Sequence, residues 1–180
     1  MEAPAEKFPD FFWASEAEWR EAHWVLDQLF EKYAPSLGRV RESARQARKN
    51  LEQHFPLFDR FTAKLSPDCN ASCCLHARVA YDFTDLIFMH ALGLTPPPHQ
   101  LRRHDREHCR YLNDNGCALP RILRPFICTW YYCAPMLELF RQEPPRDQRR
   151  YSAMMSEAQT CRRMMEEEFI QVVTKGLEQD

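Results

Sequence analysis

The sequence has few glycines and no long apolar run, and these absences exclude several classes of protein. Only four of the 180 residues are glycine. No glycine-rich loop of the kind that cradles phosphates is present, so a Rossmann-type or P-loop enzyme is not expected. No run of about 18 apolar residues occurs, so no membrane-spanning helix is predicted. The first ten residues contain two glutamates and two prolines and lack an apolar core, so a secretory signal is not expected.

A strong charge of one sign is also lacking. The formal net charge is -2 at pH 7. Glutamates are interleaved with the arginines that run from Arg39 to Arg48 and with Arg146, Arg149, Arg150, Arg162 and Arg163. This pattern favours a solvated helix face, and nucleic acid is not expected as a partner. Asp82 and Asp85 are a carboxylate pair of the kind used in acid–base catalysis, but no nucleophile with an orienting base accompanies them. A polar helix face is favoured there as well.

The N-terminal part of the chain is predicted to form a helical hairpin over residues 15–58. Ser15 is followed three residues later by Glu18, which is the signature of a capping box that satisfies two backbone N–H groups at a helix start. Apolar residues then recur at steps of three and four on both sides of Pro35. Because proline interrupts a helix, the two halves are expected to be separate helices.

Two further helices are predicted downstream. Apolar residues from Leu75 to His90 form a third stripe with helical spacing. A long C-terminal helix is expected over residues 147–175, with Asp147 as its N-cap and Gly176 as its C-cap.

These segments together predict a mainly α fold, in which a helical bundle is wrapped around an irregular, cysteine-rich metal-binding centre at residues 66–135. The chain is long enough to bury a core without staples, so a single domain over residues 1–180 is expected. Within the centre, the segment Asn113–Gly116 predicts a turn, and Thr129–Tyr132 predicts a strand fragment or a buried loop.

Cysteine is the residue that the chain has in unusual density. Seven of its eight cysteines fall in the 65 residues from Cys69 to Cys133. Because no export signal is expected, these thiols are predicted to lie in the reducing cytoplasm, where metal binding is favoured over disulfides. The candidate metal ligands are grouped as C-x3-C-C (Cys69, Cys73, Cys74), C-x7-C (Cys109, Cys117) and R-P-x2-C-x4-C (Cys128, Cys133).

A zinc ion or an iron–sulfur cluster needs about four thiolate ligands at one point. Neighbouring helical positions point about 100° apart, so Cys73 and Cys74 are not expected to be equivalent ligands of one mononuclear site. The surplus of thiols favours a cluster or more than one metal ion. The alternative, that all seven are buried structural thiols, is less favoured, and the usual C-x2-C spacing of zinc knuckles is absent.

Other candidate ligands are weaker. Cys161 falls on the apolar stripe of the C-terminal helix, so core packing is favoured for it. His104 and His108 are surrounded by charged residues, which favours a solvated turn, and His76 is a somewhat better candidate outside the cysteines. His23 and His90 sit among apolar positions and are predicted to be core histidines. Arg124 is predicted to hydrogen-bond sulfur or a carboxylate beside the metal.

The order of these motifs resembles the YkgJ-type cysteine-cluster family, a zinc- or iron-chelating domain. The resemblance covers Cys69 to Cys133 and is carried by C-x3-C-C, by Cys109-Arg-Tyr-Leu112, by Gly116-Cys117 and by Arg124-Pro125-x2-Cys128. It implies a cytoplasmic protein that binds zinc or an iron–sulfur cluster. The first motif departs from the family, because one cysteine of the leading group is missing and the spacing is x3 rather than x2.

Three classes of function follow from this sequence. The first is a binding protein with a zinc or iron–sulfur site, whose molecular role and partners are unknown. The second is an enzyme, because C-x3-C-C is similar to the cysteine motif of flagellin lysine N-methylases, which implies redox chemistry or methyl transfer. The third is an interaction module whose metal shapes a surface. Whether the chain is an enzyme stays open.

Overall fold

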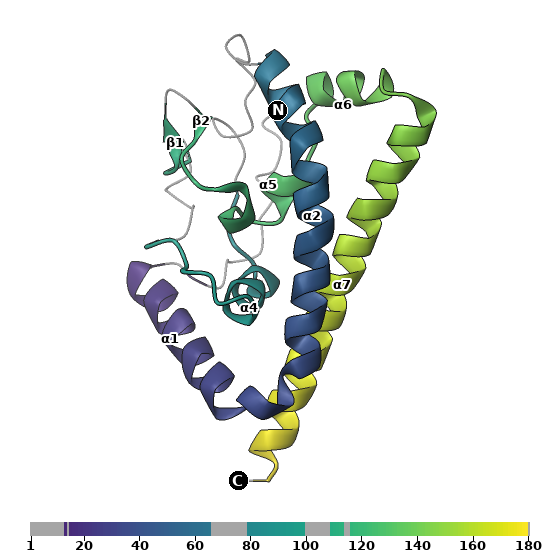
Figure 1. Cartoon of the computed structure of the whole chain (residues 1–180). Helices are drawn as coiled ribbons and strands as arrows, with labels where there is room; N and C mark the ends of the chain where they lie inside the picture. Colours follow the sequence, from purple (N-terminus) through teal and green to yellow (C-terminus); the bar gives the residue numbers. More distant parts are fainter. Residues whose placement is uncertain (1–12, 14, 66–78, 100–108, 114–115, 180) are drawn as a thin grey trace, which may run out of the picture.

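Two long helices, α2 (Gly38–Leu65) and α7 (Pro145–Leu177), lie against each other and form the spine of the fold (Figure 1). The structure is a computed structural model that describes residues 13, 15–65, 79–99, 109–113 and 116–179. On α2 the fully buried residues Val40, Ala44, Ala47 and Leu51 recur every three or four positions, so they form one apolar stripe. α2 continues beyond the predicted end at residue 58 and through Pro56, because buried Leu57, Phe58 and Phe61 anchor its last turns.

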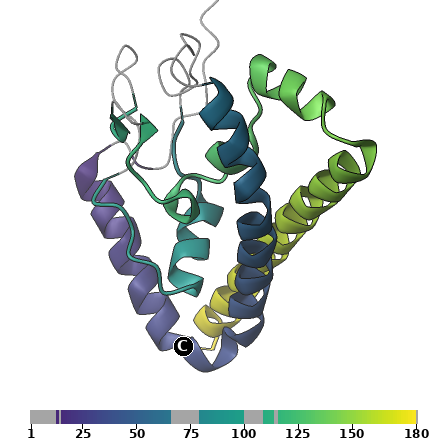
Figure 2. The same cartoon turned by 45° about the horizontal axis from the view of Figure 1, so that its top comes forward.

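Helix α1 (Glu16–Lys32) begins as the sequence predicted. The Ser15 hydroxyl accepts a hydrogen bond from the Glu18 N–H at 3.2 Å, and the Glu18 carboxylate accepts one from the Ser15 N–H at 3.2 Å. The predicted hairpin, however, is wrong in its packing. α1 diverges from α2 and packs on α4 (Phe83–Ala91), as Figures 1 and 2 show. The 3-10 turn η1 (Ala34–Ser36) turns the chain between α1 and α2, and α4 lies between these two helices.

Helix α4 begins later than the predicted third stripe. Asp82 caps it, and residues 79–82 precede it in non-helical conformation. The positive end of the α4 dipole therefore lies at Phe83. Cys73 and Cys74 fall outside the described residues.

The described part of the segment between α4 and α7 is built from short elements. The predicted turn after Asn113 is flanked by an antiparallel pair, β1 (Leu112–Asn113) and β2 (Gly116–Cys117), in which Leu112 is opposite Cys117. The 3-10 turn η2 (Arg121–Leu123) and the helices α5 (Ile127–Trp130) and α6 (Ala134–Arg141) follow. The expectation of a strand or loop from Thr129 was wrong for its first two residues, which lie in α5. The prediction of a mainly helical fold is confirmed.

The described residues form two apolar clusters. The larger one lies where α1, α4, α2 and α7 meet and contains the buried residues Trp19, Leu86, Met165 and Phe169. The smaller one lies between the C-terminal part of α2 and α6 and contains Leu57, Phe58, Phe61 and Met136. None of the described helices has the length and apolar character needed to cross a membrane.

The end of α7 provides a test of close packing. Asp147 lies in the first turn of α7 rather than at its N-cap, and Gly176 lies inside the helix. A Cβ at Gly176 would overlap the Tyr33 ring, whereas a Cβ at Gly38 would meet no atom within 4 Å. We expect Gly176→Ala to lower the free energy of unfolding by about 1–2 kcal/mol, because displacing the ring outweighs the gain in helix propensity.

The matched variant Gly38→Ala should raise the free energy of unfolding by about 0.5–1 kcal/mol, since alanine reduces the freedom of the unfolded chain without a clash. Urea denaturation of both variants measures the difference. Equal stabilisation by the two substitutions would contradict the Tyr33 contact.

Candidate functional site

The four described cysteines of the predicted metal-binding centre come from separate short elements. Cys109 precedes β1, Cys117 ends β2, Cys128 lies in α5, and Cys133 caps α6. All four are half-buried, and no disulfide joins any two of the cysteines in the described ranges. Cys69, Cys73 and Cys74 lie outside the described residues. Among the residues that the structure describes, no group of three or more His, Cys, Asp or Glu side chains is placed to hold a metal ion. The predicted ligand set is therefore not assembled from these residues alone.

Tyr81 lies near two of these four cysteines, Cys117 and Cys128. Its ring is 2% exposed, and its hydroxyl donates a 2.7 Å hydrogen bond to the carbonyl of Leu123 in η2. Burial raises the pKa of Tyr81 most strongly, and nearby Tyr111, Asp85, Cys128 and Cys117 raise it further. The thiols of Cys117 and Cys128 thus lie within electrostatic range of one buried hydroxyl.

Tyr111 extends this arrangement to Cys109. Its hydroxyl donates a 2.6 Å hydrogen bond to the carbonyl of His99, and its ring stacks on the His99 ring with centroids 5.0 Å apart. Burial is the largest cause that raises the pKa of Tyr111 to about 12, and the Cys109 thiol is among the smaller causes. Tyr81 and Tyr111 therefore lie near three of the candidate ligands, Cys109, Cys117 and Cys128.

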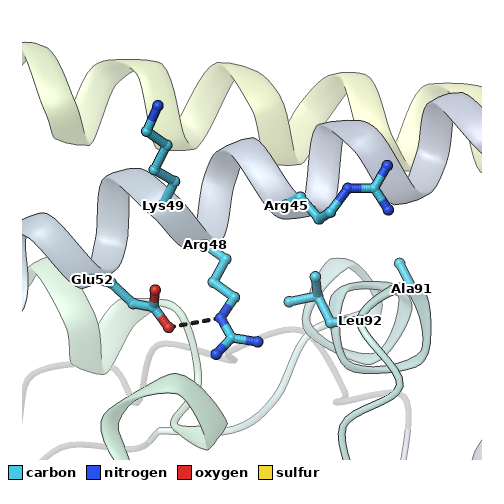
Figure 3. Close-up of a pocket in the computed structure, with 6 residues that line it drawn as sticks. All are labelled: Arg45, Arg48, Lys49, Glu52, Ala91 and Leu92. Carbon is cyan, nitrogen blue, oxygen red and sulfur yellow. Dashed lines mark hydrogen bonds and ion pairs between the residues drawn. The ribbon is translucent and has the colours of Figure 1, made fainter.

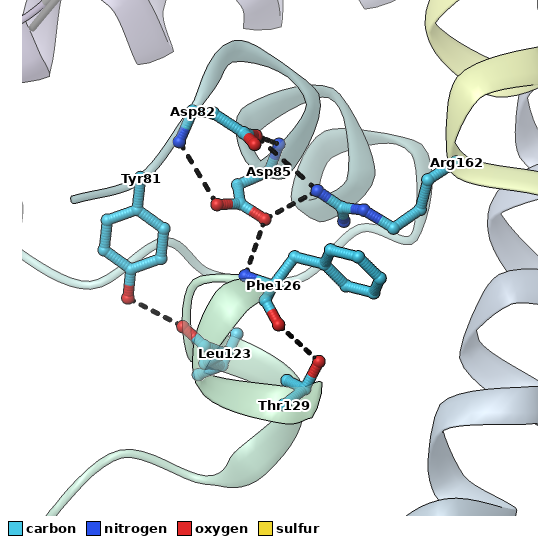
Figure 4. A network of polar contacts seen from close by, with 7 residues as sticks. All are labelled: Tyr81, Asp82, Asp85, Leu123, Phe126, Thr129 and Arg162. Atoms are coloured by element: carbon cyan, nitrogen blue, oxygen red, sulfur yellow. Dashed lines mark hydrogen bonds and ion pairs between the residues drawn. The ribbon is translucent and has the colours of Figure 1, made fainter. Parts of the chain in front are cut away.

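A buried ion pair holds the segment that carries Cys128 (Figure 4). One carboxylate oxygen of Asp85 accepts hydrogen bonds from the Arg162 guanidinium at 2.7 Å and from the backbone N–H of Phe126 at 3.0 Å. Asp85 and Arg162 are 5% and 4% exposed. Phe126 is two residues before Cys128, and the Arg162 guanidinium also lies 4.4 Å from the centre of its ring. α7 and α4 together therefore fix the start of α5.

This geometry corrects two predictions. Asp85 is not on a solvated face, because its carboxylate is buried and its other oxygen accepts the N–H of Asp82 at 3.1 Å in a reciprocal capping box. Burial raises the pKa of Asp85, and the Arg162 guanidinium opposes that rise. Arg162 was also expected on a solvated face and is instead buried. Both side chains have hydrogen-bonding partners that give them a structural role rather than one in acid–base catalysis.

Arg124 closes the loop between Cys117 and Cys128. Its Nε donates to the Leu119 carbonyl at 2.9 Å, and its terminal nitrogen donates to the Cys117 carbonyl at 3.4 Å. The predicted contact to sulfur or to a carboxylate is not among the hydrogen bonds of the described residues. The guanidinium instead fixes the backbone that carries Cys117.

The predicted core histidines form a connected chain. His23 Nδ1 lies 2.8 Å from His90 Nε2, and His90 Nδ1 lies 3.0 Å from the Asp27 carboxylate. Because Asp27 must accept from His90, neutral His90 must accept from His23, which leaves His23 Nε2 as a lone pair. That nitrogen is buried and has no hydrogen-bond partner among the described residues. The interior position predicted for both histidines is confirmed.

The remaining candidate ligands are three histidines, which the structure does not describe, and Cys161, which it does. His76, His104 and His108 lie outside the described residues. Cys161 packs against the larger apolar cluster, and burial, followed by the Glu157 charge, raises the pKa of its thiol. The prediction of core packing for Cys161 is confirmed.

The arginine face of α2 borders a cavity of about 380 Å³ beside the end of α4 (Figure 3). Arg48 pairs with Glu52 at 2.7 Å and Arg45 pairs with Glu42 at 2.6 Å, both on exposed positions of the same helix. These ion pairs neutralise much of the positive charge locally. The arrangement agrees with the predicted solvated face, and none of the described lining residues offers a buried polar group to a ligand.

Comparison of the chain with protein-family models, with curated proteins and with solved structures finds no match. Function is therefore argued from the chemistry of the residues and from the way in which the fold positions them.

Proposed function

We propose that the chain binds a zinc ion or an iron–sulfur cluster through cysteines of three segments. The ligands would come from the first group, Cys69, Cys73 and Cys74, and from Cys109, Cys117 and Cys128, with Cys133 as a further candidate. Thiolates are the ligands that zinc and iron–sulfur clusters prefer. The chain supplies seven of them in 65 residues, and no disulfide joins those in the described ranges.

The way in which the first cysteine group is tethered is the observation that carries the proposal. This group lies between the end of α2 at Leu65 and the next described residue, Val79. The end of α2 is bound to η2, because the Arg121 Nε donates to the Asp59 carboxylate at 2.5 Å. On the other side, Tyr81 is bound to Leu123, also in η2. Both attachments are therefore made to η2, which lies between Cys117 and Cys128 in the sequence.

Covalent geometry limits how far the first group can lie from that segment. Cys69 is four residues from Leu65, and Cys74 is seven residues from Tyr81. At no more than about 3.6 Å per residue, these spans reach at most about 14 Å and 25 Å. The length of the chain therefore allows Cys74 to reach the thiols near Tyr81, as the proposed shared metal centre requires.

Cys133 stands apart from the other candidates. It packs against the smaller apolar cluster with Tyr132 and Phe140, whereas Cys109 packs against the larger one. We therefore expect Cys109, Cys117 and Cys128 to be the main ligands among the described cysteines. A bound metal would also supply folding energy to residues 96–135, because the elements in the described part of this range are short.

Replacing Cys117 or Cys128 by serine is expected to lower metal content and melting temperature together, because serine is a poor ligand for these metals. Metal analysis and thermal unfolding of anaerobically purified protein measure the two quantities. A broad visible absorption identifies an iron–sulfur cluster, whereas zinc is colourless.

Cys161→Ser is the matched control, since it removes a thiol of the core and should leave metal content unchanged. Cys133→Ser tests whether that residue belongs to the centre. Full metal content in both Cys117→Ser and Cys128→Ser would remove these residues from the site and with them the proposal as stated.

A further inference from the structure

Helix α1 exposes one large aromatic side chain to solvent. α1 packs on α4, and its buried residues are Trp19, His23, Leu26 and Phe30. Trp24 lies outside this buried stripe and is 63% exposed. Tryptophan is highly buried on average and is enriched at protein–protein interfaces. An exposed tryptophan therefore makes this face of α1 the first candidate for a contact with another chain.

Trp24 belongs to a stripe of exposed residues that has opposite charges at its two ends. Steps of four, three and four residues place Arg20, Trp24, Asp27 and Glu31 on one side of α1, and all four are exposed. The stripe is thus positive at its N-terminal end and negative at its C-terminal end. Neither Arg20 nor Glu31 has an ion-pair partner within the described ranges of the chain.

This stripe is complementary to a second copy of itself that runs in the opposite direction. Arg20 and Glu31 are equally far from the midpoint of the stripe, and so are Trp24 and Asp27. A two-fold axis at that midpoint therefore places Arg20 opposite Glu31 of the second copy, and the reverse pair forms as well. The Trp24 indole N–H likewise faces the Asp27 carboxylate, which can accept it in addition to His90. A parallel arrangement would place like charges opposite each other, which disfavours it.

The adjacent stripe of α1 follows the same rule. Glu21 and Lys32 are exposed there, at the N-terminal and C-terminal ends. In the same antiparallel arrangement they lie opposite each other to within two residues, or about 3 Å along the helix axis. Long charged side chains span such an offset. Both stripes therefore favour the antiparallel direction.

We propose that the outer face of α1 binds a second copy of this chain, in a symmetric contact in which the two α1 helices run antiparallel. The partner is a second copy because the charges at the two ends of the face complement each other. The proposal is independent of metal binding, because it uses none of the candidate metal ligands.

Sedimentation equilibrium of the full chain measures the association. The unmodified chain should dimerise as its concentration rises, and salt should weaken the dimer because the ion pairs are exposed. Arg20→Glu and Glu31→Arg should each raise the dissociation constant about tenfold, since each places like charges opposite at two symmetry-related positions. Arg150→Glu reverses an exposed charge on α7 and should leave the dissociation constant unchanged.

Charge exchange then tests the antiparallel arrangement. The double variant Arg20→Glu/Glu31→Arg should dimerise like the unmodified chain, and an equimolar mixture of the two single variants should form a mixed dimer, because opposite charges face each other again in both cases. All these positions are exposed, so thermal unfolding of the variants should be unchanged. A chain that stays monomeric up to about 1 mM, a dimer that the single variants do not weaken, or no recovery in the double variant and the mixture would overturn the proposal.

Discussion

Replacement of Arg162 by methionine should lower the free energy of unfolding by about 3–5 kcal/mol, the cost of leaving one partner of a buried ion pair uncompensated. Methionine keeps much of the apolar stem of arginine, so the loss reports mainly on the charge. Asp85 would then keep only its backbone partners, including the N–H of Phe126 at 3.0 Å. Urea denaturation at pH 7 measures the change.

Two further variants separate the ion pair from general effects on α7. Arg163→Met makes the same substitution at the next residue, which is exposed, and should cost less than about 0.5 kcal/mol. Asp85→Asn combined with Arg162→Met removes both charges, while the asparagine carbonyl can still accept the Phe126 N–H. The double variant should recover much of the lost stability. If Arg162→Met and Arg163→Met have equal effects, the buried pair does not stabilise the fold.

The same pair connects the fold to the candidate site. Asp85 in α4 holds the backbone of Phe126, and α5 with Cys128 follows directly. A loosened start of α5 would move one of the proposed ligands. We therefore expect Arg162→Met to weaken metal binding as well as folding, whereas Arg163→Met should affect neither.

The burial of Arg162 was available from the sequence but was missed. Met155, Ala158, Met165 and Phe169 are buried on one stripe of α7, and Arg162 fills the gap of seven between Ala158 and Met165 at steps of four and three. A charged residue on an apolar stripe predicts a buried partner. For Arg162, residue type was given more weight than helical position. His54 likewise lies between Leu51 and Phe58 on the buried stripe of α2, so its burial follows from the same periodicity.

Local features could be predicted, and long-range packing could not. The capping box of Ser15 and the turn after Asn113 depend on residues a few positions apart, so the sequence contains all the required information. The divergence of α1 from α2 depends on α4, a distant segment that binds between them. Thr129 and Trp130 were assigned by composition to a strand or loop, whereas the Asp85 bond to Phe126 stabilises a helical start.

The candidate site shows the same division. The thiols and their grouping are visible in the sequence, but their proximity depends on Tyr81 and Arg124, which bind carbonyls in distant or neighbouring loops. These contacts cannot be predicted from the spacing of residues in the sequence. The metal itself stays a prediction, because the first cysteine group lies outside the described residues.

Acidification from pH 7 to pH 4 is expected to destabilise the fold strongly through two buried histidines. Burial is the main cause that lowers the pKa of His23 and of His54 from 6.5 to about 4. The unfolded chain therefore binds these protons more tightly than the folded chain. The stabilisation is complete above pH 6.5 and is lost as the pH falls to about 4. Each histidine contributes up to about 1.4 kcal/mol per pH unit in that window. The loss between pH 6.5 and pH 4 is therefore about 3 kcal/mol for each of the two histidines.

Asp85 acts in the opposite direction, because its raised pKa makes the folded chain take up a proton before the unfolded chain does. The net loss should therefore be smaller than the sum of the two histidine contributions. His54→Gln removes one titrating group and should reduce the slope of unfolding free energy against pH by up to about 1.4 kcal/mol per unit between pH 6.5 and 4. NMR titration of the histidine ring protons gives the midpoints directly. Midpoints near 6.5 for both His23 and His54 would show that burial does not hold these rings neutral.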